Sequence, residues 1–184
     1  MKNTILTFLI FLLPIVVLAQ NDSLLKVLPL KDGKVYYSEV IVVDSSFKNE
    51  LYSKAKKWFA NTFKSANDVI QLDDKENGEI LGKGYFEEYW SFGFAGSGAV
   101  GVFSTYKIAL KDGKYKYEIC DFRIKYKMPG NQYAAAQTFE MPIEEMQYKM
   151  KLKGQKELYI KIDNHINSII EGLKKAMIEK PESW

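Results

Sequence analysis

The glycines between residues 93 and 101, in the stretch GFAGSGAVG, have the spacing of a loop that binds a dinucleotide. Gly96, Gly98 and Gly101 match the pattern G-x-G-x-x-G, which in nucleotide-binding proteins follows a strand and opens a helix facing the pyrophosphate. Here the even-numbered residues from 100 to 110 form one mostly apolar face, which predicts a strand instead of a helix. We therefore expect no nucleotide at this loop. We interpret the glycines as a flexible connection between strands that exposes backbone amides.

The chain has one histidine and one cysteine, and neither has the neighbours that catalysis would require. His165 lies between Ile162 and Ile166 in a helical segment without an H-E-x-x-H pattern, and a triad would need a nucleophile and an acid to converge on it. A zinc site needs more histidine or cysteine than the chain contains. Cys120 lies in a strand-like stretch without a cationic pocket, so we expect an unreactive core residue that forms no internal disulfide.

Carboxylates and hydroxyls are also poorly arranged for chemistry. Glu87 and Glu88 are adjacent in a strand-like stretch, where neighbouring side chains point to opposite faces and cannot act together across a cleft. Ser97 lacks the G-x-S-x-G spacing of a nucleophile elbow, because residue 95 is alanine. The acidic stretch that starts at Asp73 fails as a calcium loop, because its third position is Lys75. We therefore predict a protein that is not an enzyme and that binds neither a metal nor a cofactor.

The composition argues against nucleic acid as a partner. Lysine and arginine together number 26 against 23 acidic residues, which leaves a formal net charge of +3. Arg123 is the only arginine, although bidentate recognition of phosphate and guanine relies heavily on arginine. A chain this close to charge balance also lacks the field that attracts a polyanion. We expect a protein or a small hydrophobic ligand as the partner, and no nucleic acid.

The N-terminus has the three parts of a secretory signal peptide. Lys2 precedes the apolar run ILTFLIFLLPIVVLA, which ends at the small residue Ala19 and is followed by the polar residues QND. Pro14 and the shortness of the run disfavour an uncleaved membrane anchor, since a spanning helix needs about 20 apolar residues. We predict a signal peptide over residues 1–19 and a single domain over residues 20–184. The mature protein would be periplasmic or secreted, with membrane contact through the signal peptide only.

Changes of hydrophobic period along the rest of the chain predict its secondary structure. The expected order is β-α-β-β-β-β-α, with strands near residues 34–44, 68–72, 78–94, 100–111 and 114–128 and helices near residues 45–68 and 155–179. Asn77 and Gly78, between two strand-like runs, predict a hairpin. Residues 128–154 show no sustained period and are expected to form a long connection. Long loops are uncommon in compact domains and are often functional, so this segment is a candidate binding region.

Three features predict how these elements pack. The first strand becomes apolar on both faces toward its end, which indicates a central place in the sheet. Ser46 is placed to cap the first helix, whose apolar stripe starts at Phe47 and includes Trp58 and Phe59 as anchors on the sheet. In the last strand the apolar positions change from odd to even after Ile119, which predicts a bulge or a strong bend.

Several pieces of sequence carry a family resemblance. They are the strand that ends VIVVD, the helix with LYSKAKKWF, the acidic hairpin and the strand with GKGYF, which together cover roughly residues 28–125. In this order, after a signal peptide, they resemble a family of secreted Gram-negative bacterial domains of unknown function, and MPIEEM is similar to a piece that often follows. The resemblance implies a TATA-binding-protein-like α+β fold, with helices on one face of a curved antiparallel sheet. It implies neither DNA binding nor any catalytic residue.

Without a catalytic constellation, we expect a binding or interaction domain that uses the exposed face of the sheet or the connection over residues 128–154. The candidate contact residues are four aromatic side chains: Tyr89, Trp90, Phe92 and Tyr133. The alternative is a carrier of a small hydrophobic ligand, held between the sheet and the C-terminal helix in a pocket lined by aromatic residues. The sequence leaves both functions open, because aromatic residues also fill ordinary cores.

Overall fold

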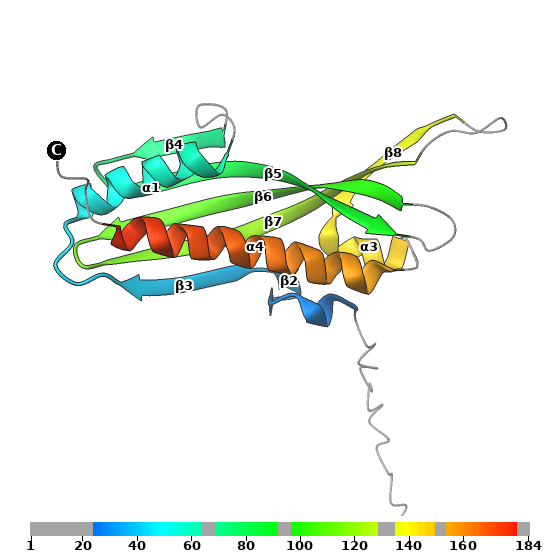
Figure 1. Ribbon diagram of the computed structural model, residues 1–184, viewed down its shortest axis with the longest axis horizontal. Helices are drawn as coiled ribbons and strands as arrows, with labels where there is room; N and C mark the ends of the chain where they lie inside the picture. The colour runs from blue at the N-terminus through cyan, green and yellow to red at the C-terminus, as the bar shows by residue number, and fades with distance from the viewer. Residues whose placement is uncertain (1–23, 64–68, 92–96, 129–134, 150–153, 180–184) are drawn as a thin grey trace, which may run out of the picture.

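Three long strands form the centre of the sheet: β5 (Glu79–Ser91), β6 (Ser97–Lys111) and β7 (Lys114–Met128). Each is antiparallel to the next, and the six-stranded sheet has the order β3-β7-β6-β5-β4, with β8 also paired to β7 (Figure 1). The computed structural model describes residues 24–63, 69–91, 97–128, 135–149 and 154–179, so the predicted signal peptide lies outside the described residues. The predicted α+β fold with an antiparallel sheet is confirmed.

The remaining elements surround this centre. They are η1 (Leu24–Val27), β1 (Leu30–Lys31), β2 (Lys34–Val35), β3 (Tyr37–Val42), α1 (Lys48–Thr62), β4 (Ile70–Asp74), β8 (Gln137–Pro142), α3 (Ile143–Lys149) and α4 (Gln155–Ile178). To the predicted order β-α-β-β-β-β-α the structure adds a short β1–β2 hairpin before β3, and β8 and α3 between β7 and α4. The prediction of a long connection without regular structure over residues 128–154 was therefore wrong, because this segment contains β8 and α3. Elements as short as β8 and α3 complete too few periods to be recognised from hydrophobic spacing.

The alternation predicted along β6 and the irregularity predicted in β7 are both present. The even-numbered positions of β6 are buried: Val100, Val102, Ser104, Tyr106, Ile108 and Leu110. On β7, Phe103 pairs with Arg123 but Thr105 pairs with Cys120, so β7 contains one extra residue at this point. Asp121 takes up the bulge with a φ of 54°. The bulge keeps the apolar side chains of β7 on the core face before and after it.

Strand β3 lies at an edge of the sheet, so its predicted central place was wrong. It pairs only with the first half of β7, and β8 pairs with the second half along the same edge. Val40 and Val42 of β3 are 57% and 67% exposed. Their apolar character therefore reflects β propensity at the surface and not burial on two faces.

Helix α1 packs its predicted stripe on the sheet but begins later than predicted. Phe47 is the N-cap residue instead of Ser46, and Phe47 is 72% exposed, so its predicted place on the buried stripe was wrong. A distant residue takes the capping role, because the Lys48 N–H donates a hydrogen bond of 2.7 Å to the Asp112 carboxylate in the turn between β6 and β7. The anchor Trp58 is buried as expected.

Glycines on the core face of β5 allow this close packing of α1. A Cβ atom at Gly82 would lie 2.6 Å from the Phe59 ring. A Cβ atom at Gly84 would lie 2.4 Å from the Tyr106 ring and 2.6 Å from the Phe63 ring. These positions are therefore filled by aromatic rings from α1 and β6 instead of by side chains of β5.

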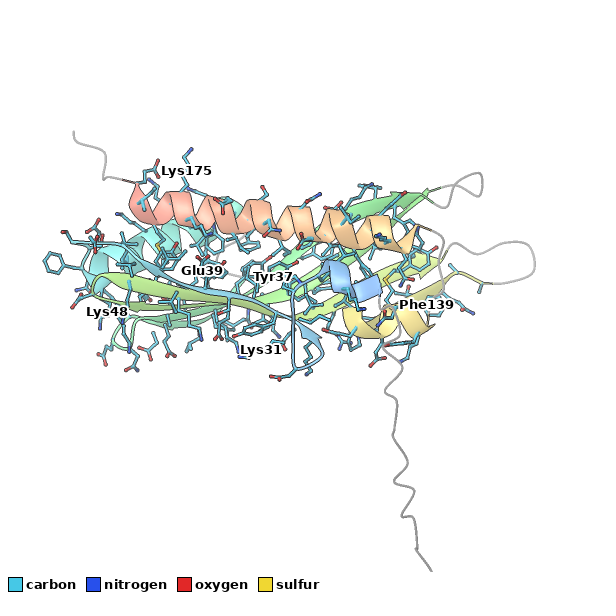
Figure 2. The ribbon with its side chains drawn as sticks, turned by 90° about the horizontal axis from the view of Figure 1, so that it is seen from below. Lys31, Tyr37, Glu39, Lys48, Phe139 and Lys175 are labelled. Atoms are coloured by element: carbon cyan, nitrogen blue, oxygen red, sulfur yellow. The ribbon has the colours of Figure 1, made fainter. Side chains whose placement is uncertain are left out.

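Helix α4 lies along the same face of the sheet, as Figures 1 and 2 show. Its buried stripe is made of Leu158, Ile162, Ile166, Ile170, Leu173 and Met177. Polar contacts flank the stripe toward β3: the Tyr37 hydroxyl donates to Asp163 at 2.7 Å, and Lys174 lies 3.1 Å from Glu39. Figure 2 shows Tyr37 and Glu39 beneath the helix. Both α1 and α4 thus cover one face, as predicted.

Candidate functional site

The face of the sheet opposite α1 and α4, which we call the outer face, carries large apolar side chains that are exposed. Strand alternation directs them outward, because residues next to them, such as Glu39, Asp73 and Phe86, face α1 and α4. An antiparallel sheet with one solvated face ordinarily presents polar residues there. The exposed apolar side chains of this face therefore make it a candidate binding surface. They are Val40, Val42, Leu72, Tyr85 and Tyr89.

Tyr85, Tyr89 and the half-buried Phe103 form the aromatic part of this face, which we call the outer aromatic patch. The ring centroids of Tyr85 and Phe103 are 4.8 Å apart. Gly101 makes room for Tyr85, because a Cβ atom at Gly101 would lie 2.7 Å from the tyrosine ring. The Tyr85 hydroxyl donates a hydrogen bond to Glu87, which together with burial raises the pKa of Tyr85 to about 12. The hydroxyl therefore stays protonated at neutral pH.

Charged groups of both signs surround the exposed apolar side chains. Lys116 pairs with Glu118, and the hydrogen bonds from Lys116 and Tyr36 hold the pKa of Glu118 below its usual value. Arg123 lies 3.1 Å from Glu140, across from β7 to β8. A hollow of about 270 Å³ on the sheet is lined by Leu72, Leu81, Lys107, Ala109 and Lys116, among others. The outer face is thus mixed in charge and not uniformly basic.

The four contact residues predicted from the sequence lie in different places. Tyr89 is on the outer face and 62% exposed. Its neighbour Trp90 points to the other face, is only 2% exposed and lies 5.4 Å from the Tyr126 ring, so it belongs to the core. Phe92 and Tyr133 lie outside the described residues. Of the predicted residues that the structure describes, only Tyr89 is available to a partner.

Sequence reasoning missed Tyr85 and Phe103. Tyr85 stands four positions before Tyr89 in β5, so the two share a face in any regular strand. That parity was readable from the sequence. The contact between Tyr85 and Phe103 depends on the register of β5 against β6, in which these residues are directly opposite each other. The register required the structure.

A second surface feature is a groove of about 800 Å³ between α1 and α4. Trp58 of α1 and Ile169, Gly172 and Ala176 of α4 contribute its apolar part. By contrast, the space between α4 and the strands beneath it, where a ligand carrier would hold its cargo, is too small for a water molecule. Of these two spaces, only the groove between the helices has room for a ligand.

His165 and Cys120, the side chains most often used in catalysis, take part in the packing of the fold. The Nδ1 atom of His165 lies 2.8 Å from the Glu88 carboxylate, and its ring stacks on Phe86 with centroids 3.9 Å apart. These contacts join α4 to β5. Cys120 is buried, and this burial raises the pKa of its thiol to about 11. The described residues contain no cluster of three or more acidic, histidine or cysteine side chains that could hold a metal ion.

None of the described helices has the length and apolar character needed to cross a membrane.

Together the fold and its surfaces define the class of this protein: an α+β domain with helices on one face of an antiparallel sheet and an exposed opposite face that carries both apolar and charged side chains. Residues 37–125 match the model of a family described as a domain of unknown function (DUF4468) with TBP-like fold. The chain carries a DUF4468 domain, which confirms the resemblance seen in the sequence. Secretion, which that resemblance also implied, is not part of this match.

Solved structures support the fold. A DUF4468 family protein from Bacteroides ovatus ATCC 8483 has a TM-score of 0.62 at 20% identity, over 88% of this chain and 96% of that chain. A TBP-like protein from Parabacteroides distasonis ATCC 8503 has a TM-score of 0.57 at 16% identity, over 80% of this chain and 97% of that chain. At these identities the likeness shows the fold and does not define a function. Among curated proteins, none matches the chain.

Proposed function

We propose that the chain is an exported, non-enzymatic interaction domain that binds a partner protein through the outer aromatic patch. The observation that supports this is the set of exposed aromatic side chains on a sheet face that α1 and α4 leave uncovered. Tyrosine and phenylalanine are enriched in protein interfaces, where they supply large contact areas at a small cost in side-chain entropy. Tyr85 is also preorganised for contact, because Gly101, Phe103 and Glu87 hold its ring.

The charges around the patch favour a protein over a nucleic acid as the partner. Glu87 bonds to Tyr85, Arg123 opposite Phe103 pairs with Glu140, and Lys125 lies opposite Gly101, so both signs of charge border the patch. A polyanion is bound by a field of one sign, whereas protein interfaces place charges of both signs around an apolar centre. The mixed rim of the outer face fits the second arrangement.

Site-specific photo-crosslinking tests the surface directly. A photoreactive phenylalanine analogue would replace Tyr89 in one variant and Tyr148 of α3 in another, in the cells that produce the protein. Tyr148 is a matched control, since it is a tyrosine of similar exposure, 64% against 62%, on a different element. We expect one discrete cross-linked protein from position 89 and none from position 148. Cross-links of equal yield from both positions, or from position 148 alone, would contradict the proposal.

A second variant connects cross-linking with affinity. Tyr89→Glu places a charge in the patch without touching the core, so thermal unfolding should be unchanged. Binding of the cross-linked partner, measured with both purified proteins, should weaken by about tenfold or more, as for the loss of an aromatic contact at an interface centre. Tyr148→Glu should leave the affinity unchanged. Equal affinities for the wild type and Tyr89→Glu would show that the patch is not the interface.

Export rests on the N-terminal residues. The cationic start, the apolar run and Ala19 support cleavage near residue 20. N-terminal sequencing of the protein recovered from the cell envelope should read QNDSLL or a start within a few residues of it. A mature protein that retains Met1 would overturn this part of the proposal without affecting the interaction surface.

A further inference from the structure

We propose that the groove between α1 and α4 binds a small amphiphilic carboxylate, with the Trp58 indole N–H as the hydrogen-bond donor and Lys57 and Lys175 as its cationic rim. The groove has a volume of about 800 Å³. Pockets for small molecules fall within about 300–1,000 Å³ and combine an apolar wall with a few polar groups that fix orientation. This site is separate from the outer aromatic patch, since α1 and α4 lie on the opposite face of the sheet.

The indole nitrogen of Trp58 lacks an acceptor. Trp58 is only 5% exposed, and its Nε1 atom is buried without a hydrogen-bond partner among the described residues. The ring is fixed by edge contacts to Phe59 and Phe63, at centroid distances of 4.8 and 5.9 Å. An indole N–H can only donate, and a buried donor ordinarily finds a partner. A ligand oxygen in the groove would satisfy this donor.

Gly172 opens the wall of the groove beside that nitrogen. A Cβ atom at Gly172 would meet only Trp58 Nε1, at 3.8 Å, which is ordinary contact. Neither close packing nor a left-handed backbone therefore requires glycine here, although glycine weakens a helix interior relative to alanine. Gly172 lies well inside α4, which spans Gln155–Ile178. The missing side chain leaves only the backbone of α4 beside the indole N–H, in the lining that both residues contribute to the groove.

The groove is lined by three lysines, Lys54, Lys57 and Lys175, and by two carboxylates, Glu50 and Glu179, so its rim carries a net positive charge. Lys54 is already occupied, because it pairs with Glu50 at 2.6 Å and donates to the Met177 carbonyl. Lys57 and Lys175 form no ion pair with any residue that the structure describes, and Figure 2 shows Lys175 near the end of α4, on the side away from the sheet. One carboxylate can accept from an ammonium group and from an indole N–H. The apolar tail of the ligand would lie along Ile169 and Ala176.

Calorimetric titration of the purified protein with dodecanoate, below its micellar concentration, tests the site. We expect saturable binding of dodecanoate and none of dodecyltrimethylammonium, which has the same tail and the opposite charge. Gly172→Leu would fill the groove beside Trp58 and improve helix propensity, so the protein should be at least as resistant to heat as the wild type. Its affinity for dodecanoate should fall by about tenfold or more. The double variant Lys57→Gln, Lys175→Gln should weaken binding similarly.

Trp58→Phe separates the donor from the aromatic surface, because it removes the N–H and keeps a ring. We expect it to weaken dodecanoate binding by about tenfold or more, as for a lost hydrogen bond to a charged group. Tyr89→Glu, on the other face, should leave dodecanoate binding unchanged, and Gly172→Leu should leave the cross-link from position 89 unchanged. Absence of saturable binding, equal binding of the cationic detergent, or wild-type affinity in Gly172→Leu would each overturn the proposal.

Discussion

Replacing Gly84 with alanine tests how α1 packs on the sheet. Gly84 faces the core from β5, and a new Cβ atom would lie 2.4 Å from the Tyr106 ring and 2.6 Å from the Phe63 ring. The two rings are 1% and 8% exposed, and their centroids are 5.0 Å apart. Neither ring can move away without displacing other core side chains. The methyl group must therefore push α1 and β6 apart or force the rings from their preferred rotamers.

The expected magnitude follows from these contacts. Overpacking of a well-packed core costs about 1–3 kcal/mol. Alanine restricts the unfolded chain more than glycine does, which offsets about 0.4–1 kcal/mol of that cost. Because both contacts are far below van der Waals distance, we expect Gly84→Ala to lie in the upper part of the range, with a net loss of about 2 kcal/mol in the free energy of unfolding. The melting temperature should fall by about 4–8 °C in a domain of this size.

Gly101→Ala is the matched control, with the same substitution on the neighbouring strand but on the outer face. Its Cβ atom would also be close to a ring, at 2.7 Å from Tyr85, but Tyr85 is 49% exposed, so its ring can shift toward solvent without displacing any core side chain. We expect stability within about 0.5 kcal/mol of the wild type. Urea unfolding followed by circular dichroism measures both variants. Equal losses in the two, or no loss in Gly84→Ala, would refute the placement of Phe63 and Tyr106 against β5.

Four further predictions concern single sites. Trp58→Ala should cost about 3–5 kcal/mol in urea unfolding, as for other large buried aromatic residues, and a loss below about 1 kcal/mol would place the indole outside the core. Two hydrogen bonds from α1 hold the pKa of Asp73 below its usual value, and the bond from Lys56 lowers it more than the bond from Tyr52. The stability that this carboxylate contributes is therefore present above its unfolded pKa and is lost as the pH falls through the folded one. Asp73→Asn should reduce the loss of thermal stability below about pH 4, and an unchanged acid profile would contradict this. Burial raises the pKa of Cys120 to about 11, so iodoacetamide at pH 8 should alkylate the folded protein about 100-fold more slowly than the unfolded chain, and similar rates would refute the burial. NAD, FAD and ATP should show no saturable binding in calorimetry, because Gly98 lies in β6 and not at the start of a helix, and binding abolished by Gly98→Val would disprove this interpretation.

Local periodicity predicted the parts of the fold that depend on which face of an element is buried. The alternation of β6 and the stripe of α4 follow directly from the sequence, because each apolar side chain there points to the same core. The bulge of β7 was also predictable, since the change of parity after Ile119 has to be absorbed by an extra residue. Asp121 supplies that residue.

The errors concern interactions between residues far apart in the sequence. Val40 and Val42 have the apolar character of residues in a central strand. The position of β3 at the edge depends on which strands pair, and the sequence of one strand does not contain that information. Likewise, Ser46 resembles a helix cap, whereas Asp112 takes that role because the turn between β6 and β7 lies beside the start of α1. Side chains supplied from another element cannot be found by a local pattern.

The candidate surfaces were predictable only in part. Tyr89 and Trp90 are neighbours in the sequence, and strand alternation alone implies that no more than one of them faces a partner. The groove could not be predicted, because it depends on how far α4 lies from α1 and on the direction in which the Trp58 nitrogen points. The Trp58 ring is held by Phe59, Phe63 and Tyr106, and the last of these comes from a strand distant in the sequence.

The bulge in β7 also bears on the order in which the chain folds. Strand β7 offers one edge to two partners, β3 before the bulge and β8 after it. Short connections join β5, β6 and β7, whereas β3 is separated from β7 by α1 and three strands. Closing a longer loop costs more chain entropy, and pairings distant in sequence tend to form late. We therefore expect the β5–β6–β7 meander to form first and β3, although synthesised earlier, to wait unpaired until the edge of β7 exists.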